Sequence, residues 1–294
     1  MPDNLSEWVF LYLRGYHVRM TAVKNQCIRI GVVNFLNATP LIEGLGSVEG
    51  IEFIPKVPSD LMNCLERGEV DFALASSIDY QRSKENIGIL PVGVLSSDGD
   101  SLTVQLCSRI PFEDVTTVHC DSDSHTSVAL LQIILKQKFN VAPEIISTDI
   151  RSLKKCNSKW PDTVLIIGDK VVSCDCQSEY EFTLDLGEAW KEQTGLPFVF
   201  AMWQGPLNCD KKIVNKISIL FGRQLLLNLQ RIEQVVSTNA LCRDWQPSLA
   251  LQYVTEHMHY DFTDAHQESL ELFYSLAHSL GILGQPRSIQ YMST

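Results

Sequence analysis

Two short polar segments of the sequence contain residue types that can hold a small polar or anionic ligand. Asn37 follows a predicted strand and precedes a predicted helix, and its carboxamide can donate and accept hydrogen bonds at once. Ser124, Thr126 and Ser127 open another predicted helix, where hydroxyls, free backbone N–H groups and the helix dipole favour an anion. The alternative is structural, because an Asn in a turn and a Ser at a helix N-cap need no ligand. We interpret His125 as a surface or capping residue rather than a base.

Four further polar residues lie where predicted strands end or where the chain crosses over. Ser76 and Ser77 follow a predicted strand over 70–75, and Asp169 follows an apolar strand over 164–167. Thr103 lies in the crossing segment 99–103. Each of these side chains could contact a ligand. Each also has an ordinary structural role, since Ser and Asp cap helices and turns and a β-branched Thr suits a strand.

Standard catalytic and cofactor-binding motifs are missing from the sequence. It contains no G-x-S-x-G elbow, no Walker loop and no GxGxxG fingerprint. Its nine cysteines are scattered, and an odd number without a secretory signal favours free thiols. Cys174 and Cys176 form the one close pair, but no second pair or His lies at ligand spacing. We therefore predict no metal site.

The composition restricts the partners. Among 294 residues, 24 Lys and Arg face 35 Asp and Glu, a net charge of −11 with no basic block, which argues against a nucleic-acid binder. The uncharged stretch 196–209 has 14 residues and two prolines, whereas a membrane-spanning helix needs roughly 20 apolar residues. Asp3 and Glu7 precede a short apolar run, so the N-terminus is a poor signal peptide. We expect a cytoplasmic protein without a membrane partner; its oligomeric state is not predicted.

Strands and helices must alternate to position these side chains. Expected strands cover residues 28–33, 51–54, 70–75, 89–95, 102–107, 115–120, 143–147, 164–167, 181–184 and 198–203, and helices lie between most of them. This alternation predicts mostly parallel sheets in an α/β fold. The remainder is expected to be helical, over 211–236, 249–257 and 264–280.

The chain is expected to cross between two lobes near residues 97–103 and to return near 197–201. Two crossings imply a hinge and a ligand cleft, the layout of a periplasmic-binding-protein type II-like fold with a helical C-terminal tail. We predict an N-terminal extension over 1–27. Lobe 1 is predicted to comprise 28–100 and 199–294, including the C-terminal helices, and lobe 2 to comprise 101–198.

Several motifs of the sequence resemble one known family. They are Phe35-Leu36-Asn37-x-x-Pro40-Leu41, Ser124-x-Thr126-Ser127-Val128, Ile166-Ile167-Gly168-Asp169 and, most specifically, the block 185–203, which reads DLGEAWKEQTGLPFVFAMW. Together they resemble the chorismate dehydratases of the futalosine route to menaquinone. The resemblance extends in the same order from about residue 28 to 280.

This resemblance implies a cofactor-independent lyase that removes water from chorismate and leaves 3-[(1-carboxyvinyl)oxy]benzoate. The key residues of the family are the Asn of the opening motif, here Asn37, and a hydroxyl residue at the first crossing. That position is usually Ser in a Gly-Pro-Val-x-Ser stretch; here the segment is Gly99-Asp100-Ser101-Leu102-Thr103, so Thr103 takes its place. We assign substrate binding to Ser76, Ser77, Ser124, Thr126, Ser127 and Asp169.

Two alternatives to this function remain. One is the sister enzyme of the same pathway, which acts on cyclised dehypoxanthine futalosine and shares the fold. The other is a non-catalytic protein that only captures a carboxylate ligand. No side-chain base is apparent in the sequence, so in the dehydratase interpretation the base could be the enolpyruvyl carboxylate of the substrate itself.

Overall fold

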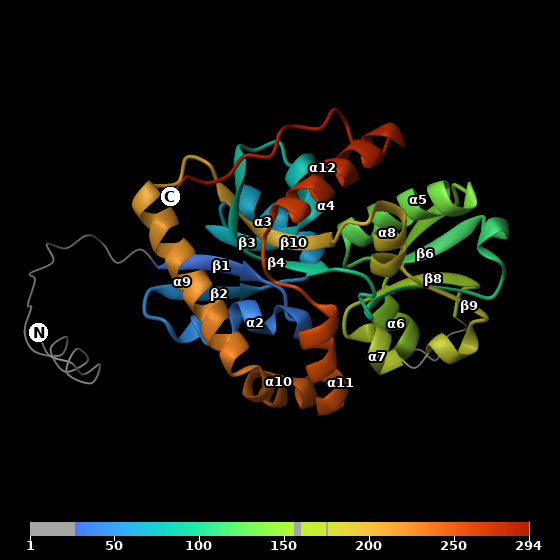
Figure 1. The fold of residues 1–294 in the computed structure, drawn as a ribbon, viewed down its shortest axis with the longest axis horizontal. Coiled ribbons are helices and arrows are strands. Elements are labelled where there is room, and N and C mark those ends of the chain that lie inside the picture. The colour runs from blue at the N-terminus through green and yellow to red at the C-terminus, as the bar shows by residue number, and fades with distance from the viewer. Residues whose placement is uncertain (1–26, 156–159, 175, 294) are drawn as a thin grey trace, which may run out of the picture.

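The computed structural model of the protein describes residues 27–155, 160–174 and 176–293, and these form two α/β lobes that lie side by side (Figure 1). The sheet of the first lobe has the strand order β2-β1-β3-β10-β4. Its strands are β1 (Ile28–Val32), β2 (Ile51–Pro55), β3 (Phe72–Ser76), β4 (Ile87–Ser97) and β10 (Phe198–Pro206). Strand β1 pairs in parallel with β2 and β3, whereas β10 is antiparallel to β3 and β4. The helices between these strands are η1 (Leu36–Ala38), α2 (Thr39–Ile42), η2 (Leu45–Ser47), α3 (Pro58–Glu66) and α4 (Ser77–Arg82).

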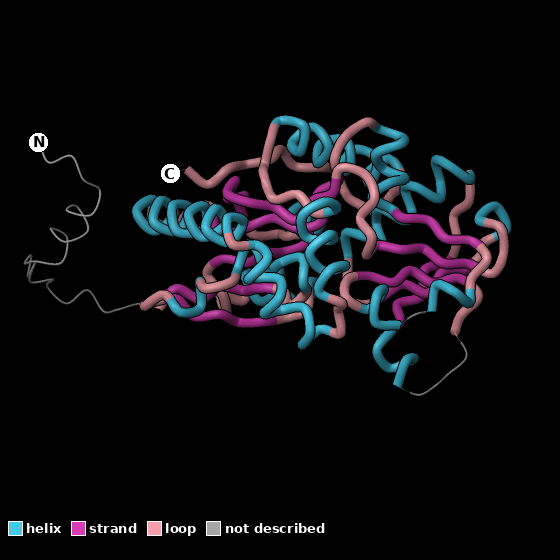
Figure 2. Tube along the Cα trace, turned by 60° about the horizontal axis from the view of Figure 1, so that its bottom comes forward, coloured by secondary structure: helices cyan, strands magenta, loops and turns pink. Residues whose placement is uncertain are grey.

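The sheet of the second lobe has the order β7-β6-β8-β5-β9. Its strands are β5 (Val104–Ser108), β6 (Thr117–Asp121), β7 (Glu144–Thr148), β8 (Thr163–Ile167) and β9 (Phe182–Asp185). Its helices are η3 (Phe112–Asp114), α5 (His125–Phe139), α6 (Ile150–Lys155), α7 (Lys170–Cys174), η4 (Cys176–Glu179) and α8 (Leu186–Thr194). Figure 2 shows the two sets of strands as separate groups with helices around them.

The two sheets have the same topology, and this topology explains the two crossings. The strand that follows a crossing takes the fourth position of each sheet: β10 in the first lobe and β5 in the second. Each of these two strands runs antiparallel to both of its neighbours. The carboxyl ends of β1 and β3 in one lobe therefore face those of β6 and β8 in the other. The expected limits of the lobes, at 100/101 and 198/199, stay a prediction.

The C-terminal part is helical, as expected, but the helices are divided differently. They are α9 (Lys211–Gln230), α10 (Ile232–Ala240), η5 (Leu241–Arg243), α11 (Pro247–Gln252), the π-helical turn η6 (Tyr253–His257) and α12 (Asp264–Ser279). The helix predicted over 211–236 is interrupted at Arg231, whose φ of −118° and ψ of 32° are not helical. Helix α12 packs against α4, α5 and β10, so it contacts both lobes. No helix in the described part of the chain is long and apolar enough to cross a membrane.

The core is apolar on both faces of each sheet. Every residue of β3 and of β8 is buried, which explains why both strands read as nearly continuous apolar runs. The larger core cluster contains residues of both lobes. At the second crossing, Trp190 of α8 packs edge-on against Phe198 and Phe273, and its indole N–H donates to Ser269 Oγ at 3.1 Å. Helix α12 thereby fixes the return of the chain into the first lobe.

Candidate functional site

A cavity lies between the two lobes, with about 530 Å³ of empty space when the open solvent at its mouth is included. Both lobes and the C-terminal part contribute to its wall. The lining residues are Val33, Phe35, Asn37, Pro58, Ser76, Leu95, Ser101, Thr103, Val104, Ser124, Ser127, Ile167, Gly168, Phe200, Ala201 and Met258. None of them carries a charge, so a ligand in this cavity would be held by hydrogen-bond donors, acceptors and apolar contacts.

Asn37 lines the cavity from η1, the short helix directly after β1. Its Oδ1 atom is buried and has no hydrogen-bond partner among the described residues. A buried carbonyl oxygen without a partner is uncommon in folded proteins, because desolvating it without compensation costs about 1–3 kcal/mol. The side chain of Asn37 therefore presents a free acceptor at the place where the sequence analysis expected a ligand contact.

Thr103 also lines the cavity, and an unusual turn of the crossing segment places it there. The backbone N–H of Thr103 donates to the carbonyl of Ser101 at 2.6 Å, and Leu102 between them has a φ of 59°. A non-glycine residue in this left-handed region costs of order 1–3 kcal/mol and persists only where its surroundings hold it. Asp185 supplies that hold, since its carboxylate accepts from Ser101 N at 2.9 Å and from Ser101 Oγ at 2.8 Å. Burial raises the pKa of Asp185 to about 7.

Ser124 and Ser127 line the cavity at the start of α5, and they also cap that helix. Ser124 Oγ accepts from Ser127 N at 3.1 Å and donates to Ser127 Oγ at 2.9 Å. The segment is therefore both a helix cap and part of the cavity wall, and its contact with a ligand stays a prediction. Ser76, at the end of β3, lines the cavity from the opposite lobe.

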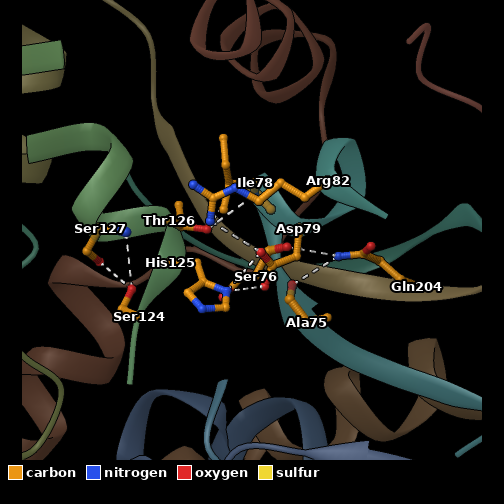
Figure 3. Close-up of polar contacts among 11 residues, drawn as sticks. Ala75, Ser76, Ile78, Asp79, Arg82, Ser124, His125, Thr126, Ser127 and Gln204 are labelled. Carbon is orange, nitrogen blue, oxygen red and sulfur yellow. Dashed lines mark hydrogen bonds and ion pairs between the residues drawn. The ribbon is translucent and has the colours of Figure 1, made fainter. Parts of the chain in front are cut away.

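Ser77 and Thr126 do not line the cavity but connect the lobes beside it. Ser77 Oγ lies 3.4 Å from Thr126 Oγ1 of the other lobe, and Thr126 Oγ1 accepts from the backbone N–H of Ile78 at 3.2 Å. Figure 3 shows Thr126 and His125 at the start of α5 directed toward α4. Their predicted contact with substrate stays a prediction, and what the structure gives them is an interlobe contact.

His125 belongs to the same interlobe junction. Its Nδ1 lies 2.9 Å from both carboxylate oxygens of Asp79, whose side chain is buried on α4 (Figure 3). Arg82 lies 3.7 Å from the same carboxylate. The pair of His125 and Asp79 links the first turn of α5 in the second lobe to α4 in the first lobe. This link can stabilise the arrangement in which the two lobes enclose the cavity.

Asp169 likewise lies outside the cavity wall and connects three parts of the chain. Its carboxylate accepts from the backbone N–H of Leu36 at 3.2 Å and from the indole N–H of Trp245 at 3.0 Å. Burial raises the pKa of Asp169. Because Leu36 directly precedes Asn37, Asp169 fixes the segment that presents the free acceptor, and a direct contact with substrate stays a prediction.

A second, outer hollow, with about 590 Å³ of empty space when open solvent is included, adjoins the cavity and shares Phe35 and Pro58 with it. Lys56 of the first lobe and Arg151 of the second line this outer hollow. Arg151 pairs with Asp123 at 2.8 Å. Lys56 and Arg151 are thus absent from the cavity wall. The buried Lys170, whose ammonium lies 5.9 Å from the centroid of the Phe35 ring, pairs with Asp121 and Asp123.

The structure offers no metal centre in the part of the chain that it describes, since no group of three or more His, Cys, Asp or Glu side chains gathers there. The side chains of Cys174 and Cys176, the close pair of the sequence analysis, lie outside the described part.

The fold and the interlobe cavity define a class of protein, the two-lobed binding-protein fold with its ligand site in the cleft. Protein AF1704 from Archaeoglobus fulgidus superposes with a TM-score of 0.71 at 13% identity, covering 89% of this chain and 100% of that one. The alkanesulfonate-binding protein SsuA from Xanthomonas axonopodis pv. citri superposes with a TM-score of 0.66 at 12% identity, covering 88% and 94%. At these identities the likeness shows the fold alone, and it confirms the predicted fold class.

Sequence comparison narrows this class to one family. The sequence model of a family described as menaquinone biosynthesis matches residues 28–279, so the chain belongs to that family. A chorismate dehydratase from Thermus thermophilus is 29% identical over 190 residues, which are 59% of this chain and 68% of that protein. The resemblance seen in the motifs is thereby confirmed.

Proposed function

We propose that this protein is a chorismate dehydratase that forms 3-[(1-carboxyvinyl)oxy]benzoate in menaquinone biosynthesis. Membership of the family and the similarity to the Thermus thermophilus enzyme support this function. The observation that carries it is the uncharged interlobe cavity, in which the buried Oδ1 of Asn37 lacks a partner and the Thr103 hydroxyl lies at the wall.

The reaction needs little from the protein beyond positioning. A proton leaves the ring carbon that carries the enolpyruvyl ether, and the hydroxyl leaves the neighbouring carbon, so that together they form water. The electron pair of the broken C–H bond completes the aromatic ring, and aromatisation drives the elimination. Holding the leaving group and the proton acceptor in reactive geometry then accounts for the rate.

Specific roles follow for the residues at the wall. Asn37 Oδ1 accepts a hydrogen bond from the ring hydroxyl and orients it for departure. The start of α5 around Ser124 and Ser127 receives one substrate carboxylate, as the positive end of a helix does. Thr103 donates to a second polar group of the substrate. The enolpyruvyl carboxylate of chorismate itself takes the proton, since no titratable side chain lines the cavity.

The test is incubation of the purified protein with chorismate, followed by the loss of diene absorbance and by mass spectrometry of the product. We expect a product lighter than chorismate by one water, formed at the same rate in the presence of a chelator. Saturable binding of chorismate without turnover would instead identify a carboxylate-binding protein. Absence of both binding and turnover would favour the sister enzyme, with cyclised dehypoxanthine futalosine as the next substrate to assay. The cytoplasmic location stays a prediction.

A further inference from the structure

Tyr253, a residue that the sequence analysis did not consider, contacts the candidate site from the C-terminal helices. It opens the single π-helical turn η6, a local geometry that often accompanies functional sites. Its side chain is 1% exposed, and its hydroxyl lies 2.8 Å from Thr103 Oγ1, 150 residues away along the chain. The turn η6, far along the chain, thus contacts Thr103, the residue whose hydroxyl matches the family motif at the first crossing.

The position of the Tyr253 ring is fixed by its neighbours. The ring stacks on Trp245, with centroids 4.9 Å apart and planes inclined by 12°. The Trp245 indole in turn donates to Asp169, which accepts from the backbone beside Asn37. The aromatic pair therefore holds the phenol hydroxyl in a constant place relative to both candidate catalytic side chains, Asn37 and Thr103.

The hydrogen-bonding capacity of this group decides what Tyr253 can do. Burial raises the pKa of Tyr253, and hydrogen bonds with Thr103 and Asn37 oppose that rise only in part. The hydroxyl therefore keeps its proton at neutral pH and is a donor, not a base. It has one proton to give. When Tyr253 gives it to Thr103 Oγ1, the Thr103 proton is left with one long hydrogen bond, to the carbonyl of Ser101 at 3.4 Å. A closer acceptor on the substrate can replace this long bond.

We propose that Tyr253 is a positioning residue for the dehydration: it donates to Thr103 Oγ1 and thereby directs the Thr103 proton into the cavity toward the substrate. This inference rests on the proposed function and deepens it, since it assigns a hydrogen-bond direction to the site. Tyr253 acts through Thr103 and exchanges no proton with chorismate.

A double-mutant cycle tests this role. Tyr253→Phe removes the hydroxyl and keeps the stacking on Trp245, and Thr103→Val removes the hydroxyl that Tyr253 would direct. We expect Tyr253→Phe to lower kcat about 5- to 30-fold with KM within about twofold of wild type, which is the effect of one hydrogen bond felt mainly in the transition state. The variant with both changes should be no slower than Thr103→Val alone, because coupled residues are not additive.

Tyr80→Phe is the matched control. Tyr80 is also fully buried, and its hydroxyl bonds to the backbone of Ser288 and Gln290 outside the cavity wall. Loss of the Tyr80 hydroxyl should lower the melting temperature and leave kcat unchanged. Thermal unfolding of each variant separates such a structural loss from a change in catalysis.

The outcomes are distinct. An active wild type with Tyr253→Phe at full kcat, or with effects of Tyr253→Phe and Thr103→Val that multiply, would overturn the inference alone. A wild type that leaves chorismate unchanged would refute the proposed function and the inference with it. A slow Tyr253→Phe that unfolds like wild type, together with a non-additive cycle, supports the inference.

Discussion

Replacement of Asn37 by alanine should abolish most of the activity without weakening the fold. In most buried positions, truncation of an Asn removes hydrogen bonds that the native state needs. Asn37 differs, since its Oδ1 is buried without any partner among the described residues. Asn37→Ala therefore takes no hydrogen bond accepted by Oδ1 away from the folded protein and loses only the contact of its side chain with the Tyr253 hydroxyl. It also removes the acceptor that we assign to the ring hydroxyl of chorismate.

The magnitude follows from the partner that is left unpaired. A substrate hydroxyl enclosed without its acceptor costs about 1–3 kcal/mol. Felt only in the transition state, this corresponds to a loss of about 5- to 150-fold in kcat. Asn37→Asp should be no better, because a carboxylate in this cavity would repel a substrate with two negative charges.

Asn228 provides the contrasting control. It is fully buried under α2, its amide donates to two backbone carbonyls at 2.9 and 3.0 Å, and its oxygen accepts from two side chains at 2.9 and 3.1 Å. With a further bond from Arg231 Nε at 3.3 Å, five hydrogen bonds at about 0.5–1.5 kcal/mol each give Asn228→Ala a stability loss of roughly 2.5–7.5 kcal/mol. The folded fraction of Asn228→Ala should turn over chorismate at close to the wild-type rate.

The assay combines turnover of chorismate, followed by its diene absorbance, with urea unfolding of both variants. Asn37→Ala should be slow and stable, and Asn228→Ala active and unstable. Dehydration by Asn37→Ala at the wild-type rate would remove Asn37 from the site. A large stability loss in Asn37→Ala would show that its oxygen has a partner within the fold, and the argument from a free acceptor would fail.

Three further perturbations test the surroundings of the site. Because burial raises the pKa of Asp185 to about 7, the folded chain holds a proton that the unfolded chain releases near its usual pKa of about 4. The stability that Asp185 contributes is therefore lost as the pH rises through about 7. Urea unfolding should show this fall in the free energy of unfolding for wild type but not for Asp185→Asn, and an equal fall in both proteins would contradict the role of Asp185. Asp79→Asn removes the carboxylate 2.9 Å from the histidine at the start of α5, and steady-state kinetics should show a KM several-fold higher with kcat little changed, whereas an unchanged KM would argue against a role in closure. Gly168 and Gly281 have φ of 65° and 71°, but a Cβ meets the Phe35 ring at 3.3 Å only at Gly168. Thermal unfolding should show both alanine variants destabilised by roughly 1 kcal/mol, and only Gly168→Ala should lower kcat/KM; equal kinetics would exclude the ring contact from the site.

Most of the fold could be predicted because local pattern and topology agree. Strands such as β3 and β8 are buried on both faces and therefore read as apolar runs, and polar residues mark their ends. The interruption at Arg231 could not be predicted, since apolar residues at helical spacing continue through it into α10. For the same reason the sequence predicts ordinary helix where the structure has the π-helical turn Tyr253–His257.

The site was predictable in position but not in detail. Asn37, Ser76, Thr103, Ser124 and Ser127 follow from the rule that ligands bind at strand and helix ends, and all five line the cavity. Spacing along the chain does not tell whether a hydroxyl at such an end faces the cavity or the opposite lobe. Ser77, Thr126 and Asp169 occupy the same kind of position as these five, yet their side chains bond across the lobes.

The absence of charge in the cavity wall agrees with a substrate that supplies its own base. A Lys or Arg beside the enolpyruvyl carboxylate would stabilise its charged form and lower its pKa, which would weaken it as a proton acceptor. In the proposed mechanism, neutral donors would bind the substrate with a smaller loss of basicity, and closure of the lobes would remove the water that solvates the carboxylate. The cations Lys56 and Arg151 line the outer hollow instead, where they can attract an anion toward a protein of net charge −11. In the proposed mechanism, attraction of the anion in the outer hollow and neutral hydrogen bonding in the cavity would thus be two separate functions, and Phe35 lines both spaces.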